Sequence, residues 1–205
     1  MLDPTQILND ASALSALIII GLVIFAEAGL LIGVLLPGDT LLIPAGLLAA
    51  QGRLPLAGVL LVAWIGSVLG SETGYYIGSK AGKRIFRRRN SLLLRQEYLT
   101  KAHKFYSKHG GKAILIARFL PFIRTCAPLV AGATKMDHRT FMIFNIIGGG
   151  IWVAVTVLAS YWLGSIIPNI DAYILPITAI ILICALTPAL YKLLHSQKRT
   201  GKRRK

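Results

Sequence analysis

Charged residues are scarce in this sequence, and acidic residues are the scarcest of them. Only 15% of the 205 residues are charged, with 8 Asp and Glu against 23 Lys and Arg. A soluble domain has about 25% charged residues, whereas this chain is 55% hydrophobic with a mean hydropathy of +0.64. Long uncharged stretches alternate with basic ones, as water and hydrocarbon alternate along a membrane protein. The composition excludes an ordinary soluble domain and predicts an integral membrane protein.

Cysteine and histidine are too few and too dispersed for the usual disulfide or metal sites. The two cysteines, Cys126 and Cys184, lie in apolar stretches, so we interpret them as small buried side chains. The four histidines lie in polar segments, at positions 103, 109, 138 and 195. Neither a metal cluster nor a Ser–His–Asp arrangement can then be drawn inside the membrane. We expect no metal, no cofactor and no catalytic residue, and predict that the protein is not an enzyme.

The basic residues gather in two segments that lie beside apolar ones. Of the 23 Lys and Arg, ten lie in residues 83–112 and seven in residues 192–205, and the net charge is +15. Such an excess is typical of the cytoplasmic side of membrane proteins and attracts anionic lipid headgroups. No nucleic-acid-binding motif accompanies the charge. The pattern therefore predicts a membrane surface, and no nucleic acid, as the partner of these segments.

Hydropathy predicts an all-α polytopic fold in a single domain over residues 1–205. Four stretches are long enough to cross about 30 Å of hydrocarbon: residues 13–36, 54–78, 141–167 and 173–191. Two apolar stretches that are short or broken by prolines and charges are predicted to be re-entrant: residues 37–53 and 113–134. The remaining segments are a basic amphipathic stretch, 83–112, and a basic tail, 192–205. Placing both on the cytoplasmic side puts the N- and C-termini there as well.

The two broken stretches share a pattern of prolines. Pro37 and Pro44 are seven residues apart, as are Pro121 and Pro128, and Ala-Gly closely follows each second proline. This internal echo predicts inverted repeats with two opposed re-entrant hairpins, an arrangement in which transporters bind substrate at the breaks. We expect six residues to shape the hairpins: Pro37, Gly38, Pro44, Pro121, Pro128 and Gly132.

Four charged side chains are predicted to lie inside the membrane: Glu27, Asp39, Arg118 and Arg124. An ionised group there costs about 2.5–3.5 kcal/mol on insertion scales, so it should pair or line a wet cavity. The two acids are candidates for proton coupling; the alternatives are a structural ion pair for Glu27 and a helix cap for Asp39. The two arginines are candidates to bind a phosphate through paired hydrogen bonds, and the alternative is ion pairing with the acids.

Three other features carry predictions about packing and helix ends. Gly66, Gly70, Gly74 and Gly78 are spaced four apart, which predicts that another helix approaches this face closely. Asp137 is expected to cap the helix that follows it. Glu72 is interpreted as an interfacial residue.

Several blocks of the sequence resemble the DedA family of bacterial inner-membrane proteins. The blocks are residues 27–31, 36–42 and 118–132, supported by 70–78 and 145–164. The resemblance implies two opposed re-entrant hairpins and a role in moving lipids, and it places the family's essential charged residues at Glu27, Asp39, Arg118 and Arg124. The chain departs from many relatives at Ser71, where they have Asp, and also at Val34 and Ser160.

The function expected from these observations is a lipid flippase of the inner membrane. The resemblance implies undecaprenyl phosphate or a related phospholipid as cargo, coupled to the proton motive force, so the expected partners are a membrane lipid and protons; a homo-oligomer is left open. The alternatives are a proton-coupled transporter of a small ion or solute, an intramembrane phosphatase, and a scaffold without transport.

Overall fold

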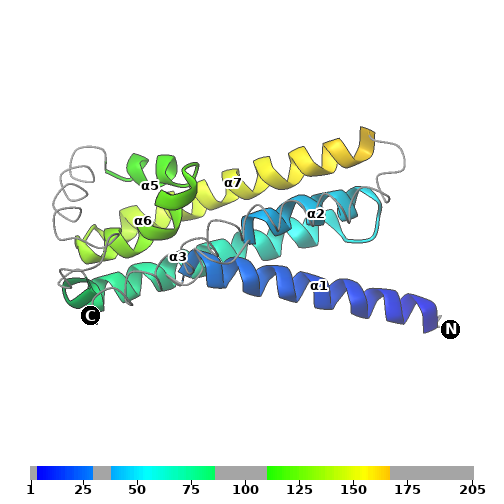
Figure 1. The fold of residues 1–205 in the computed structure, drawn as a ribbon, viewed down its shortest axis with the longest axis horizontal. Helices are drawn as coiled ribbons and strands as arrows, with labels where there is room; N and C mark the ends of the chain where they lie inside the picture. The colour runs from blue at the N-terminus through cyan, green and yellow to red at the C-terminus, as the bar shows by residue number, and fades with distance from the viewer. Residues whose placement is uncertain (1–3, 30–37, 86–109, 167–205) are drawn as a thin grey trace, which may run out of the picture.

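The computed structural model describes residues 4–29, 38–85 and 110–166, and every regular element in these ranges is a helix. Figure 1 shows three long helices that run along the length of the molecule: α1 (Pro4–Gly29), α3 (Leu56–Ile85) and α7 (His138–Ile166). Each contains a stretch that is long and apolar enough to cross a membrane, of 18, 26 and 29 residues respectively. The prediction of an all-α membrane protein is confirmed for this part of the chain.

The long helices extend beyond the predicted spans at their polar ends. α1 begins at Pro4 rather than at residue 13, and a proline is well tolerated in the first turn because its missing N–H has no partner there. α3 continues to Ile85 because backbone hydrogen bonds do not require apolar side chains. The basic segment predicted at 83–112 therefore starts inside α3.

The two broken stretches of the sequence contain short helices. α2 (Gly38–Ala50) and α6 (Pro121–Ala133) have 13 residues each, and α5 (Lys112–Ala117) has six. At about 1.5 Å per residue, α2 and α6 are each roughly 20 Å long, which is less than the hydrocarbon thickness. Leu120 is extended between α5 and α6, and Pro121 is the first residue of α6, a position that suits its fixed backbone angle.

Some of the predicted features lie outside the described residues. These are Pro37, most of the amphipathic segment, the span at 173–191 and the tail at 192–205. The re-entrant path of the chain and the total number of spans therefore remain predictions.

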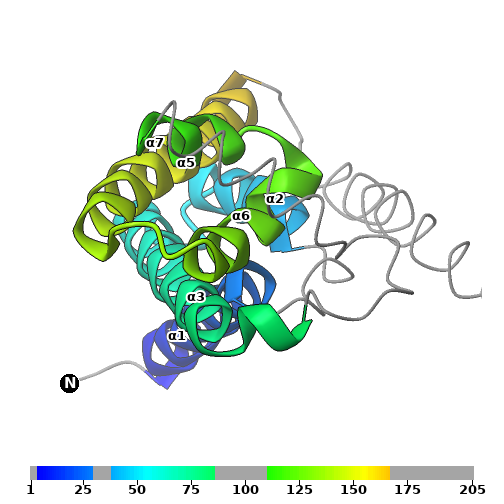
Figure 2. The ribbon, with the colours of Figure 1, turned by 90° about the vertical axis from the view of Figure 1, so that its left-hand side faces the viewer.

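Each of the two 13-residue helices, α2 and α6, packs on a long helix from the other half of the sequence. α2 packs against α7, and α6 packs against α3, while α1 also lies along α3. In Figure 1, α2 lies beside one half of the molecule and α5 and α6 lie beside the other, and in the end-on view of Figure 2 α6 overlaps α2. Two related halves would produce such reciprocal packing, in which a short helix of each half lies on a long helix of the other. The inverted relation of the halves remains a prediction.

Glycine permits the closest of these contacts. A Cβ added at Gly66 would lie 2.6 Å from the carbonyl oxygen of Gly21 on α1, and one added at Gly78 would overlap the carbonyl oxygen of Leu129 on α6. The prediction that a neighbouring helix approaches this glycine face is confirmed. The glycine face of α3 packs against two helices, α1 along the first half of α3 and α6 along its second half.

Apolar side chains fill the interior and also cover the outside of the long helices. Leu42, Val59 and Val157 are fully buried between α2, α3 and α7. Leu22 and Val155, by contrast, are exposed on α1 and α7. A helix that is apolar on its outer face as well as its inner face is typical of a membrane span.

Candidate functional site

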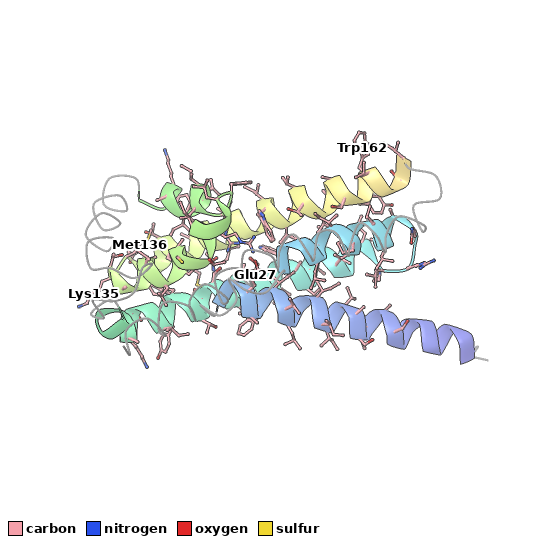
Figure 3. All side chains as sticks on the ribbon, viewed as in Figure 1. Glu27, Lys135, Met136 and Trp162 are labelled. Atoms are coloured by element: carbon pink, nitrogen blue, oxygen red, sulfur yellow. The ribbon has the colours of Figure 1, made fainter. Side chains whose placement is uncertain are left out.

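The candidate site lies near the middle of the long axis of the molecule. Figure 3 shows Glu27 there, between the region of α2 and the region of α6. Glu27 comes in the last turn of α1 as the structure describes it, and its exposed fraction is 6%. Lys135 and Met136 lie at one end of the molecule and Trp162 at the other. A charged group is therefore held about halfway along an apolar bundle.

Arg124 of α6 forms an ion pair with Glu27. Its Nη2 donates to Glu27 Oε1 over 3.0 Å, and both side chains are almost completely buried. The guanidinium carbon also lies 4.2 Å from the centre of the Trp152 ring on α7, a cation–π geometry that is stronger when water is excluded. Arg124 is thus held by a carboxylate from the first half of the chain and an aromatic ring from the second.

Arg118, which directly follows α5, is held by neutral side chains in the hydrogen bonds that the structure describes. Its Nη1 donates to Ser67 Oγ over 2.8 Å, and its Nη2 donates to Ser71 Oγ over 3.3 Å and to Asn145 Oδ1. The exposed fraction of Arg118 is 9%. The two serines lie one turn apart on α3, so their hydroxyls reach the two terminal nitrogens of the same guanidinium.

A small polar cavity joins the surroundings of the two arginines. It has a volume of about 20 Å³, and its lining includes Ser67, Ser71, Arg118, Arg124, Thr125 and Asn145. A cavity of this size has room for about one water molecule. A phosphate group is larger than this cavity.

The four predicted intramembrane charges have different positions in the structure. Glu27 and Arg124 are in contact, as the ion-pair alternative predicts, and Arg118 lines the same cavity as Arg124. Asp39 is the second residue of α2, but its side chain is outside what the structure describes, so its role remains a prediction. Of the predicted hairpin residues, Pro44 and Pro128 lie inside helices and Gly132 packs closely against α3.

Sequence reasoning missed the neutral partners of the arginines. Ser67, Ser71 and Asn145 carry no charge, and the search for costly groups considered only ionised side chains. A signal was available, because Asn145 is an amide in a predicted span without charges, and a polar side chain in a membrane helix usually faces a partner.

One end of the molecule carries a second polar cluster. Asp137 Oδ2 accepts hydrogen bonds of 2.8 Å from the backbone N–H and from the hydroxyl of Thr140, which confirms the predicted cap of α7. The N–H of Thr140 lowers the pKa of the Asp137 carboxyl, with further contributions from the hydroxyl and from Arg139.

Glu72 pairs with the half-exposed His138, in agreement with its predicted interfacial position. Among the described residues, no three His, Cys, Asp or Glu gather as a metal site.

Comparison with known proteins identifies the family. The model of the VTT domain matches residues 36–162. Protein DedA of Escherichia coli is 37% identical over 186 residues, which cover 90% of this chain and 84% of that protein. The chain belongs to the DedA family. An uncharacterised membrane protein of Mycobacterium leprae is 39% identical over 88% of this chain and 82% of its own length. The inner membrane protein YqjA of Escherichia coli is 34% identical over 69% and 64%. No solved structure matches the chain.

The part of the chain that matches the VTT-domain model includes most of the site. The VTT match begins just before α2 and ends at residue 162 in α7, so it contains both arginines and their neutral partners. Glu27 precedes the matched range. The resemblance inferred from the sequence is confirmed, and the protein is an α-helical membrane protein of this family.

Proposed function

We propose that this DedA-family protein moves a lipid with a phosphate headgroup between the two leaflets of the membrane. The cargo proposed is undecaprenyl phosphate or a related phospholipid. The observation that supports this best is the polar cavity near the middle of an apolar bundle, lined by the guanidinium groups of Arg118 and Arg124. Two cations in that position are expensive to keep, and a guanidinium binds phosphate oxygens through parallel, charge-assisted hydrogen bonds.

Phosphate oxygens can replace the serine hydroxyls that accept hydrogen bonds from Arg118. The hydroxyls of Ser67 and Ser71 accept hydrogen bonds from its two terminal nitrogens, and two oxygens of one phosphate can accept from the same two nitrogens. A charged acceptor bonds roughly twice as strongly as a neutral one, so a phosphate that reaches the cavity displaces the hydroxyls. The hydrocarbon tail of the lipid stays in the bilayer throughout.

Glu27 supplies the proposed link to the proton gradient. Its carboxylate pairs with Arg124 in the closed conformation, and a phosphate that binds Arg124 competes with it. Protonation of Glu27 weakens the pair and makes Arg124 available to the phosphate, while loss of the proton restores the pair and releases the cargo. Asp39 is proposed as a second proton-exchanging carboxylate. No covalent step and no cofactor are involved in this cycle.

Transport requires the cavity to open to one leaflet at a time. The lining comes from the break after α5, from α6, and from α3 and α7, so a shift of α5 and α6 against the long helices opens it. We propose a location in the bacterial inner membrane with both termini in the cytoplasm. The basic segments support this orientation, and the name of the relative YqjA, an inner membrane protein, supports the location.

The experiment that tests the proposal follows a labelled polyprenyl phosphate between leaflets of proteoliposomes. We expect translocation by the intact protein and by Arg139→Ala, because Arg139 is exposed at the start of α7, and almost none by Arg118→Ala. An imposed proton gradient should accelerate transport by the intact protein. Equal translocation by Arg118→Ala would contradict the proposal, and movement of inorganic phosphate without lipid would support the solute transporter instead.

A further inference from the structure

α7 contributes an amide to the arginine site that the proposed transport cycle does not use. Asn145 is the most deeply buried polar residue of the site, with an exposed fraction of 1%. Its Oδ1 accepts a hydrogen bond from Arg118 Nη2, and its Nδ2 donates one of 3.1 Å to the backbone carbonyl of Val68 on α3. The side chain therefore connects the arginine to the backbone of a neighbouring helix.

The two hydrogen bonds fix the orientation of the amide. If its oxygen and nitrogen exchanged places, the NH₂ group would face the guanidinium, which has only donors, and the oxygen would face the Val68 carbonyl, which has only acceptors. Both contacts would then be repulsive. Asn145 consequently presents a fixed acceptor to Arg118, whereas a serine hydroxyl can rotate.

The same face of α7 is shaped to hold the guanidinium. Gly148 and Gly149 follow Asn145 at spacings of three and four, which places them on one side of the helix. A Cβ at Gly148 would lie 3.0 Å from Arg118 Cδ, and one at Gly149 would lie 3.3 Å from Arg118 Nη1. α7 therefore offers an acceptor and a shallow surface without side chains to the same arginine.

We propose that Asn145 is a positioning residue for the lipid phosphate site, and that it sets the plane in which Arg118 meets its ligand. This inference rests on the proposed function. When phosphate oxygens replace the hydroxyls of Ser67 and Ser71, Asn145 keeps its bond to Val68 and continues to hold one edge of the guanidinium. Without Asn145 the arginine remains in the cavity but adopts several orientations, so phosphate binding weakens more than the rate of transport falls.

The first test compares transport by Asn145→Leu with transport by Ser160→Ala in proteoliposomes that contain a labelled polyprenyl phosphate. Ser160 is also buried on α7, but its hydroxyl bonds to Thr156 of its own helix. We expect Asn145→Leu to raise the KM by about tenfold or more, because it removes a hydrogen bond to a charged group, with a smaller change in kcat. Ser160→Ala should match the intact protein. An unchanged KM for Asn145→Leu would overturn the inference.

A double-mutant cycle distinguishes positioning from a general effect on packing. If Asn145 acts through Arg118, adding Asn145→Leu to Arg118→Lys should change the KM far less than it does in the intact protein. Full additivity would contradict the inference. If Asn145→Leu does not fold, Asn145→Ala takes its place, since it removes the bonds to Arg118 and Val68 without adding an apolar side chain or a charge. The same rise in KM is expected, and a KM equal to that of the intact protein would overturn the inference.

A second readout does not depend on the cargo. Phenylglyoxal modifies arginine, and mass spectrometry of the purified protein gives the rate at Arg118. We expect faster modification in Asn145→Leu than in the intact protein or in Ser160→Ala, at equal folded fraction, and equal rates would overturn the inference. If the intact protein moves no lipid, the proposed function fails, while this measurement still decides whether Asn145 positions Arg118.

Discussion

The two arginines of the site differ in what surrounds them. Arg124 is held by the carboxylate of Glu27 and the ring of Trp152, whereas the described hydrogen bonds of Arg118 end on neutral oxygens. Breaking a buried ion pair by removing one partner costs about 3–5 kcal/mol, because the other charge stays buried. The pairing of Arg124 thus depends on the charge of a carboxylate. The partners of Arg118 are neutral and are easily exchanged.

The ion pair predicts the effect of Glu27→Gln on coupling. Glutamine has nearly the same shape but cannot exchange a proton, so Arg124 loses the partner whose charge responds to the gradient. We expect downhill translocation of polyprenyl phosphate to persist and its acceleration by a proton gradient to disappear. The measurement compares initial rates in proteoliposomes with and without the gradient, with the intact protein as reference. A gradient response equal to that of the intact protein would show that Glu27 is not the coupling group.

The cation–π contact predicts a stabilising role for Trp152. A buried contact of this kind contributes about 2 kcal/mol, so Trp152→Leu should lower the Tm of the purified protein in detergent. Trp162 lies on the same helix, and its exposed fraction is 67%, so Trp162→Leu is the matched control and should leave the Tm nearly unchanged. Equal effects of the two substitutions would indicate that the contact with Arg124 contributes nothing.

At the scale of residues, the sequence could predict the charged members of the site but not their neutral partners. The cost of burying a charge singled out Glu27, Arg118 and Arg124, because few other charges lie in apolar stretches. Ser67 and Asn145 are inexpensive to bury when bonded, and their contacts span 51 and 27 residues of sequence. Only the packing of α3 and α7 around the break after α5 brings them to Arg118.

The helices are held together by close contacts between backbones. Gly78 of α3 and Gly132 of α6 each face a backbone carbonyl of the other helix, Leu129 and Tyr75 respectively, at a distance that excludes a Cβ. In a membrane, where lipid is as apolar as a side chain, such tight packing is a main source of helix association. The position of α6, and with it Arg124, depends on these glycines.

This packing predicts that alanine at either glycine is destabilising. Overpacking typically costs about 1–3 kcal/mol, so Gly78→Ala and Gly132→Ala should lower the Tm and reduce translocation by displacing α6. Gly21 of α1 is the matched control, because a Cβ there would lie 3.6 Å from Val62, an ordinary contact distance. A Tm for Gly132→Ala equal to that of Gly21→Ala would contradict this account of the α3–α6 contact.

The cap of α7 predicts a dependence of stability on pH. The pKa of Asp137 is below its ordinary value because the N–H of Thr140 bonds to the carboxylate. The stabilisation is therefore present above the unfolded-state pKa of about 3.9, and it is lost as the pH falls through the lower folded-state pKa. We expect Asp137→Ala to have a lower Tm than the intact protein at pH 7 and a similar Tm at strongly acidic pH. A difference that stays constant over this range would rule out the carboxylate as its cause.

At the scale of elements, the sequence could predict which segments are helical. It was less successful in predicting the residues at which the helices end. The glycine spacing on α3 predicted a close neighbour, but it could not show that α1 and α6 share that face. Pro44 and Pro128 lie inside helices, and their predicted role in shaping hairpins remains a prediction. Their missing N–H groups are tolerated in membrane helices because local adjustments and neighbouring helices satisfy the freed carbonyls.

At the scale of the whole molecule, the two halves of the chain meet at the cavity between Arg118 and Arg124. α2 packs on α7 and α6 packs on α3, so neither half can move without changing the contacts of the other. The cavity between Arg118 and Arg124 lies where residues from both halves meet, and at about 20 Å³ it is smaller than a phosphate group. In the proposed transport cycle, a short helix shifts against the long helix of the other half and exposes the cavity to one leaflet.

The proposed function requires this cavity to recognise the phosphate group of a lipid. The most direct measurement is equilibrium binding of a polyprenyl phosphate, and of the corresponding polyprenol without phosphate, to the purified protein and to Arg118→Ala and Arg124→Ala. The account predicts that the phosphate binds much more tightly than the alcohol and that each substitution raises its Kd by about tenfold or more. Equal binding of phosphate and alcohol, or an unchanged Kd in both variants, would contradict it.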